Sequence, residues 1–324
     1  MKIKQLILSF TITLFAVIMV ACSPKSDKIQ IGILQFAQAG ALDDARLGFI
    51  EALEEKGFID GETIEITVSN ANTDFSLMNT QAKSLIRNSD LVLGIATPAA
   101  QALLNEAILQ NSNIPVLFTA VTDPVAADLV TSLNEPGANV TGTTDLNPVG
   151  AQLDLIKELL PNATKVGFIY TSSEDNSIIQ LNLAKTHLEN SELDLELVER
   201  SITDVSELEQ VARTLARSVD IIYIPTDNVI SDAIETIGGV LLAEKIPAIV
   251  GEEGMISATP SLTLGINYFN LGIQTGNQAA LILNGQSPSL IPVEGQTNHN
   301  FKMNEELLLE IGITIPESLK SRVD

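Results

Sequence analysis

Two apolar stretches of similar sequence, each leading directly into a helical segment, constrain the fold more than any other feature of this chain. Asp90–Thr97 reads DLVLGIAT and Asp220–Thr226 reads DIIYIPT. Continuous apolar runs of this length are typical of strands buried on both faces of a parallel sheet. Another strand start follows each helical segment, at Ile114–Pro115 and at Ile246–Pro247. The sequence therefore predicts two α/β units that repeat each other.

The segments around these stretches also correspond between the two halves. A strand, a polar loop, a helix, a strand and a helix follow one another from Ile29 and again from Lys165. This order indicates duplication of an α/β lobe, and a chance pairing of two common βαβ units is the alternative. A length of 324 residues suits two domains. We predict an α/β fold with two lobes joined by a hinge and a ligand cleft between the lobes.

The turn at Asp145–Pro148 is the predicted first crossing between the lobes, because turn-forming residues gather there. The predicted N-terminal lobe spans residues 29–145 and about 270–292. The predicted C-terminal lobe spans residues 146–269 and about 293–324.

Residues 1–21 have the features of a signal peptide. Two lysines precede the apolar run Leu6–Ala21, which is too short for a comfortable membrane span. The run ends in MVAC, which resembles a bacterial lipoprotein processing site, and Cys22 is the only cysteine. An ordinary cleaved signal followed by a stray cysteine is the alternative. Because a lone thiol forms no internal disulfide and would be reactive outside the cell, we expect Cys22 to carry a lipid and residues 22–28 to form a tether.

The charge balance narrows the possible partners. The chain carries 18 basic and 41 acidic residues, a formal net charge of −23. Nucleic acid is excluded as a partner because its phosphates need a basic face. A surface this acidic is expected to stay in solution beside an anionic membrane. We therefore expect a monomer outside the cytoplasm, held at the cell membrane or outer membrane only by its N-terminal lipid.

Sequence signatures of enzymes are missing. The chain has no G-x-S-x-G nucleophile elbow, no G-x-x-x-x-G-K-[ST] phosphate loop and no G-x-G-x-x-G fingerprint. His187 and His299 have no companion at the spacing of metal ligands. Asn70–Asp74 has the alternating oxygens of a calcium loop, but Phe75 stands where that loop needs glycine. We predict no catalytic residue, no metal and no cofactor.

Small polar residues gather instead at the carboxyl ends of the predicted strands. Ligands of open α/β sheets bind at these ends, where the amino ends of helices also lie. Helix capping and core packing are the alternatives for each residue. The polar set comprises Gln35, Thr97, Thr119–Asp123, Thr143–Asp145, Ser173–Ser177 and Thr226–Asn228.

Two polar rims that face each other suit a small zwitterionic ligand. Its carboxylate would meet hydroxyl and backbone N–H groups at Thr97 and Ala120–Thr122. Its ammonium group needs an acceptor, and the carboxylate of Asp227 is the candidate. Three apolar residues are candidates to cover a hydrophobic side chain of the ligand: Phe36, Leu42 and Tyr268.

Five motifs follow one another along the chain in a specific order. They are Phe118–Pro124 (FTAVTDP), Asn139–Thr144 (NVTGTT), Ser173–Ser177 (SEDNS), Tyr223–Asn228 (YIPTDN) and Tyr268–Gly276 (YFNLGIQTG). With these motifs the chain, from Ile29 to about Ile315, resembles the ABC transporter substrate-binding protein family that includes tryptophan and tyrosine binders. The resemblance implies the periplasmic-binding-protein type I fold: two Rossmann-like lobes, three hinge crossings and a ligand in the cleft.

The same resemblance implies which residues line the ligand site. Near residue 38 many relatives carry His-Pro, whereas this chain has Gln38–Gly40, so the identity of the ligand stays open. The implied ligand contacts are Gln35, Leu42, Asp43, Thr97, Pro98, Thr119, Ala120, Val121, Asp123, Thr144, Ser173, Asn176, Ser177, Thr226, Asp227 and Tyr268.

We therefore predict an extracytoplasmic substrate-binding lipoprotein of an ABC importer. It would bind a small zwitterionic ligand, an aromatic or other hydrophobic amino acid, by closure of the lobes, and present it to an ABC permease coupled to an ATPase. The first alternative is a sensory binding lobe that presents its ligand to a membrane receptor without transport. A hydrolase that uses Glu252 and Glu253 is the more distant alternative.

Overall fold

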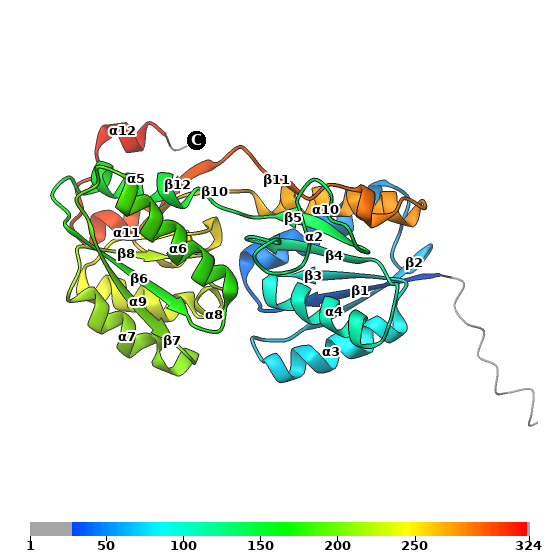
Figure 1. The fold of residues 1–324 in the computed structure, drawn as a ribbon. Coiled ribbons are helices and arrows are strands. Elements are labelled where there is room, and N and C mark those ends of the chain that lie inside the picture. Colours follow the sequence, from blue (N-terminus) through cyan, green and yellow to red (C-terminus); the bar gives the residue numbers. More distant parts are fainter. Residues whose placement is uncertain (1–27, 323–324) are drawn as a thin grey trace, which may run out of the picture.

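The computed structural model describes residues 28–322, which form two lobes that lie side by side, each built on a six-stranded sheet (Figure 1). The predicted signal peptide and Cys22 lie outside the described residues. No helix between residues 28 and 322 is both long enough and apolar enough to cross a membrane.

The first sheet is parallel throughout and has the strand order β11-β5-β4-β3-β1-β2. Helices pack around it, as α/β sheets built of buried apolar strands require. Its strands are β1 (Ile29–Gln35), β2 (Ile64–Asn70), β3 (Leu91–Ile95), β4 (Val116–Val121), β5 (Val140–Thr144) and β11 (Glu294–Gly295), and its helices are α2 (Gly40–Glu55), α3 (Phe75–Asn88), α4 (Thr97–Leu109), α10 (Tyr268–Leu283) and the short 3-10 helix η3 (Pro288–Leu290).

The second sheet has the order β12-β10-β9-β8-β6-β7, and only its β10–β12 pair is antiparallel. Its strands are β6 (Lys165–Thr171), β7 (Glu196–Ile202), β8 (Ile221–Ile224), β9 (Ala248–Val250), β10 (Ser261–Gly265) and β12 (Asn300–Met303). Its helices are α5 (Val149–Leu159), α6 (Asp175–Asn190), η1 (Val205–Glu207), α7 (Leu208–Ala216), α8 (Asn228–Asp232), α9 (Ile234–Glu244), η2 (Glu253–Ala258), α11 (Glu305–Glu310) and α12 (Glu317–Lys320).

The two sheets share one topology. The order β2-β1-β3-β4-β5 in the first lobe corresponds to β7-β6-β8-β9-β10 in the second, and every pair within these sets is parallel. The predicted α/β fold with two lobes is confirmed, and the shared order agrees with duplication of one lobe. In each sheet the order reverses beside the first strand, which is where ligands of such sheets bind.

Three segments pass between the lobes along the top of Figure 1. They connect β5 to α5, β10 to α10 and β11 to β12. The amide of Gln296 ties the second and third crossings together: its Nε2 donates to the carbonyl of Asn267 at 2.6 Å, and its Oε1 accepts from the N–H of Asn267 at 3.1 Å. Because β11 belongs to the first sheet, the chain leaves the first lobe after Gly295, a few residues beyond the predicted boundary near residue 292.

Glycines explain why α10 returns to the first lobe. A Cβ on Gly48 of α2 would lie 2.0 Å from the carbonyl oxygen of Phe269, and one on Gly272 of α10 would lie 2.0 Å from that of Ala45. Only residues without a side chain allow the two helix backbones to approach so closely. The start of α10, which carries Tyr268, is therefore held firmly on the first lobe.

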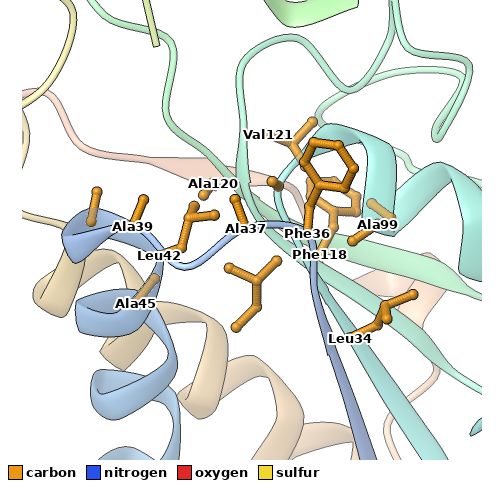
Figure 2. Close-up of a cluster of buried hydrophobic side chains, with 14 of the residues drawn as sticks. Leu34, Phe36, Ala37, Ala39, Leu42, Ala45, Ala99, Phe118, Ala120 and Val121 are labelled. Atoms are coloured by element: carbon orange, nitrogen blue, oxygen red, sulfur yellow. The ribbon is translucent and has the colours of Figure 1, made fainter. Parts of the chain in front are cut away.

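Apolar side chains fill the first lobe behind the cleft (Figure 2). Phe36 and Phe118 lie close together there, with Ala99 and Val121 beside them, and all four side chains are fully buried. Phe36 also contacts the ring of Phe75, with centroids 5.1 Å apart. Phe36 is thus a core residue and not an exposed residue of the cleft rim.

Some elements differ from the sequence expectations. The helical pattern from about Val229 to Glu244 predicts a single helix, but the structure divides it at Ala233 into α8 and α9. The sequence pattern predicts a strand at Leu193–Val198, and the structure has this strand as β7, which starts later, at Glu196, and ends at Ile202. This strand lies at the edge of its sheet and is mostly exposed, so no continuous apolar run marks it. Helix α5 and strand β12 have no counterpart among the predicted elements.

Candidate functional site

A cavity lies between the lobes, at the carboxyl ends of the strands. Its walls come from the starts of α2 and α6, the ends of β4, β8 and β9, and the first and second crossings. A concave site enclosed between two lobes suits a small ligand rather than a macromolecule. The cavity is lined by Ala39, Ala41, Leu42, Ala120, Thr122, Asp145, Asn176, Thr226, Asp227, Asn228, Ser231, Glu252, Met255 and Tyr268.

The wall from the first lobe is mostly apolar. Leu42 lies in the first turn of α2, and Ala120 lies at the end of β4. Ala120 has a φ of +55°, a left-handed conformation that costs energy for a residue other than glycine. The register of β4 with β5 shifts between Phe118 and Val121, so the chain bends where it reaches the cavity.

Asp145 and Tyr268 bring the first and second crossings together. The hydroxyl of Tyr268 donates to Oδ2 of Asp145 at 2.8 Å. Asp145 is 4% exposed, and its Oδ1 has no hydrogen-bond partner among the described residues. Burial raises the pKa of Asp145, and the bond from Tyr268 opposes that rise. The pKa of Tyr268 is raised by burial and by Asp145, so the phenol stays a donor.

Asn176 lies in the first turn of α6, in the second lobe, and is 2% exposed. Its Nδ2 donates to Oε2 of Glu174 at 3.0 Å and to the carbonyl oxygen of Thr226 at 2.8 Å. Both amide hydrogens are therefore used inside the protein. Its Oδ1 is buried and has no partner among the described residues. The cavity thus contains a second unpaired acceptor, contributed by the opposite lobe.

Asp227 is the N-cap of α8, as the capping alternative expects, and it also lines the cavity. Its Oδ1 accepts from the hydroxyl of Thr171 at 2.8 Å and from the N–H of Ile230 at 3.0 Å. Its Oδ2 accepts from the N–H of Thr171 at 2.6 Å and from the hydroxyl of Ser177 at 2.8 Å. Burial raises the pKa of Asp227, and these bonds lower it. Both oxygens of Asp227 are engaged within the protein.

Glu252 extends the acidic side of the cavity from the end of β9. It is 3% exposed, and its oxygens accept from the hydroxyl of Ser231 at 2.9 Å and from the N–H of Gly254 at 2.6 Å. Burial, with smaller contributions from Asp145 and Glu253, raises the pKa of Glu252 to about 7. Glu252 is therefore close to half-protonated near neutral pH.

The charges of the lining residues favour a ligand with a positive, hydrogen-donating group. Asp145, Asp227 and Glu252 are acidic, and the lining contains no lysine, arginine or histidine. An unpaired buried acceptor costs free energy until a donor reaches it, and a charged donor gives the strongest bond. An ammonium group supplies such donors. Within residues 28–322 no group of three or more His, Cys, Asp or Glu side chains is placed to hold a metal ion.

The structure brings some of the predicted ligand contacts to the cavity. Those that line it are Leu42, Ala120, Asn176, Thr226, Asp227 and Tyr268. Phe36, expected on the rim, does not line it.

Other predicted contacts are engaged behind the cavity wall of the first lobe. Gln35 and Asp43 accept from the guanidinium of Arg46, at 3.0 Å and 2.8 Å, and fix the start of α2. Thr119 shares a hydrogen bond of 3.0 Å with Thr143. Val121 is a core residue, Asp123 accepts from the N–H groups of Val125 and Ala126, and Thr144 donates to the carbonyl of Thr122.

The remaining predicted contacts have separate places. Thr97 and Pro98 are buried at the start of α4, and the hydroxyl of Thr97 has no partner among the described residues. Ser173 is exposed in the loop before α6. Ser177 donates to Asp227. The structure places these residues outside the lining of the cavity.

Several lining residues are absent from the predicted contacts. Asp145 belongs to the polar set at strand ends, but Thr144 beside it was the predicted contact. Glu252 follows β9, so the rule that sites lie at the carboxyl ends of strands would have found it. Ser231 and Met255 carry no such signal, because each lies one turn or more beyond a strand end.

The two lobes contact each other directly beside the cavity. Nε2 of Gln101, on α4, donates to Oδ2 of Asp175, at the start of α6, at 3.0 Å. The backbone of Gln38 hydrogen bonds Asp232. Such contacts exist only when the cleft is closed, so they belong to the closed form of the molecule.

Comparison with known proteins gives a consistent result. The family model described as ABC transporter substrate binding protein matches residues 30–324. The chain is also 39% identical over 279 residues to the tyrosine-binding protein of Clostridioides difficile (strain R20291). The aligned region covers 86% of this chain and 79% of that protein.

Two solved structures differ in how well the whole chain superimposes on them. The ABC domain in complex with L-Trp from Streptococcus pneumonia is 34% identical, with a TM-score of 0.86. The ligand-free, open structure of a substrate binding protein with adhesive properties from Clostridium difficile is 37% identical, with a TM-score of 0.67. Both comparisons cover 91% of this chain and 98% of the solved chain. The lobes of this chain are therefore arranged more like those of the complex.

Proposed function

The chain belongs to the ABC transporter substrate-binding protein family, and from that premise we propose that it binds a free aromatic amino acid, tyrosine or tryptophan, and delivers it to the permease of an importer. Members of this family bind solutes and are not enzymes, so the hydrolase alternative is set aside. Members of the family work with an ABC permease, which receives the small-molecule ligand.

The observation that carries the proposal is the pair of unpaired acceptors in the cavity. Oδ1 of Asp145, from the first crossing, and Oδ1 of Asn176, from the second lobe, are both buried and lack partners among the described residues. The ammonium group of an amino acid would donate to both and neutralise part of the charge. Because the two acceptors come from different parts of the hinged molecule, the ligand would favour the closed form.

The rest of the cavity supports an amino acid with an aromatic side chain. Leu42, Met255 and the ring of Tyr268 give it an apolar surface. The hydroxyl oxygen of Thr226 accepts from Nε2 of Gln180, which leaves the Thr226 proton for the carboxylate of the ligand. The relatives support the same class, since one is a tyrosine-binding protein and another was solved in complex with L-Trp.

The direct test is calorimetric titration of the purified protein with L-tyrosine, L-tryptophan, L-phenylalanine and L-leucine. We expect binding heat with tyrosine or tryptophan, and weaker binding of leucine because it lacks an aromatic ring. An absence of heat with all of these ligands would overturn the amino-acid proposal. Delivery to an importer is tested separately, as loss of labelled amino-acid uptake when the chain is deleted from its host.

Lipid attachment at Cys22 is part of the proposal and rests on the MVAC sequence alone. Cys22→Ser is expected to abolish incorporation of labelled palmitate and to release the protein from the membrane fraction. Ligand affinity of the released protein should be unchanged, because the variant leaves residues 28–322 as they are. Continued membrane association of the Cys22→Ser protein would show that another segment anchors it.

Ligand affinity is expected to fall as the pH drops below about 7. Glu252, which faces Asp145, Glu253 and Tyr268, has a pKa raised to about 7, and an ammonium ligand prefers its ionised form. The fall should approach about tenfold per pH unit, since one proton competes with the ligand. Titrations at several pH values from about 5.5 to about 8.5 measure it. The Glu252→Gln variant should show a flatter profile, and an equally steep profile in that variant would contradict the assignment.

The stability of the ligand-free protein is expected to change in the opposite direction. The pKa of Glu252 rises from 4.5 in the unfolded chain to about 7 in the folded protein, so the folded state holds the proton more tightly. The stabilisation from this proton is fully present below pH 4.5 and is lost as the pH rises through 7.

A further inference from the structure

We infer that Glu174 is a positioning residue. It determines that the oxygen of the Asn176 amide, and not the nitrogen, faces the ligand. The site therefore selects ligands that donate a hydrogen bond at this place. The inference rests on the proposed function, because it concerns a ligand in the same cavity. Glu174 itself is fully buried and does not line that cavity.

The orientation of the Asn176 amide follows from its partners. Nδ2 lies 3.0 Å from a carboxylate oxygen of Glu174 and 2.8 Å from the carbonyl oxygen of Thr226. Burial and the nearby Asp227 raise the pKa of Glu174 to about 8, so its carboxyl carries a proton near neutral pH. Oε2, the oxygen beside Asn176, already accepts from three N–H groups, whereas Oε1 accepts only from Val229, so the proton belongs on Oε1 and Oε2 stays an acceptor. The carbonyl of Thr226 never carries a hydrogen. The nitrogen must therefore point into the protein, and the oxygen must point into the cavity.

Glu174 is held in place independently of Asn176. Its Oε1 accepts from the N–H of Val229 at 2.9 Å, and its Oε2 accepts from the N–H of Asn228 at 3.1 Å and from the side-chain amide of Asn228. These donors belong to the first turn of α8. The carboxylate thus connects the start of α8 to the start of α6, and its position does not depend on a ligand.

A flipped Asn176 amide would be strongly disfavoured. Its oxygen would face the oxygens of Glu174 and Thr226, and two hydrogen bonds would be exchanged for two repulsive contacts. A ligand group at this place must therefore donate, as the ammonium group of an amino acid does. A keto group at the same place would meet a fixed acceptor and be rejected, because a site built for one hydrogen-bond pattern discriminates strongly against a mismatch.

The test compares tyrosine with 4-hydroxyphenylpyruvate, its 2-keto analogue, in wild type and two variants. Glu174→Met removes the acceptor at similar length, so Asn176 is free to turn its nitrogen toward the ligand. The ratio of the two affinities should fall by about tenfold or more. Glu174→Gln keeps an amide oxygen in reach of Asn176 and should hold the ratio within about threefold of wild type.

Asp220→Asn is the matched control. Asp220 also accepts from backbone N–H groups of the second lobe, those of Thr164 and Lys165, but it lies at the other end of β8. Its replacement should lower stability and leave the ratio of affinities unchanged. A parallel loss of both affinities in Glu174→Met, with an unchanged ratio, would overturn the inference and leave Glu174 a purely structural residue.

A measurement on the wild-type protein covers the case in which Glu174→Met does not fold. In NMR spectra of the tyrosine complex, the side-chain amide protons of Asn176 should show contacts to the amide protons of Asn228 or Val229 and none to the ligand. Contacts from those protons to the ligand would overturn the inference. If the wild-type protein binds no amino acid, the proposed function fails. The orientation of the Asn176 amide can still be determined in that case, from NMR spectra of the ligand-free protein.

Discussion

Asp145→Asn is expected to raise the Kd for the amino-acid ligand about 100-fold, which corresponds to about 2.8 kcal/mol. Among the residues that line the cavity, Asp145 has the only carboxylate oxygen without a hydrogen-bond partner within residues 28–322. The variant keeps the size of the side chain and an oxygen for the hydroxyl of Tyr268. It removes the charge that an ammonium group would meet. Calorimetric titration measures the change.

Stability should respond differently to the same substitution. Burial raises the pKa of Asp145, so its charge is unfavourable in the ligand-free protein, and the variant should unfold at the wild-type temperature or above it. Asp123→Asn is the control, because Asp123 caps a turn outside the cavity and asparagine caps equally well. An Asp145→Asn protein that binds within about threefold of wild type would contradict the ammonium assignment.

Asp227→Asn is expected to lower the free energy of unfolding by about 3 kcal/mol. The carboxylate of Asp227 accepts backbone N–H groups on both oxygens, from Thr171 on one and from Ile230 on the other. The amide nitrogen of asparagine cannot accept, so in either orientation one buried N–H loses its partner. Thermal or urea unfolding, monitored by circular dichroism, measures the loss.

Asp74→Asn separates this effect from ordinary helix capping. Asp74 is the N-cap of α3 and accepts from Ser76 and Leu77 near the surface, where asparagine is as good a cap. We expect almost no change in that variant. An Asp227→Asn protein that is as stable as wild type but has lost ligand binding would contradict this prediction. Asp227 would then act mainly as a ligand contact, although both of its oxygens are engaged within the protein.

The fold was largely predictable because its signals are local. Apolar runs such as Asp90–Thr97 identify buried strands, and capping residues close in sequence mark some helix starts, such as Asp74 before α3 and Asn267 before α10. The repeated order of these elements predicted two lobes, and the shared topology of the two sheets agrees with it. The bounds of the edge strand β7 and the division of α8 from α9 were not predicted, because an exposed strand and a single change of helix direction leave little trace in an apolar pattern.

The sequence by itself determined the two-lobed architecture and the edge of each sheet where the site lies. Only the tertiary structure decided which polar atoms at that edge remain free. Asp227 and Asp145 both follow strands, but Thr171, 56 residues away, engages Asp227, while Tyr268, 123 residues from Asp145, engages only one of its oxygens. Partners this distant meet only when the chain has folded. Local pattern therefore located the site, and long-range hydrogen bonding determined which residues in it are left to bind a ligand.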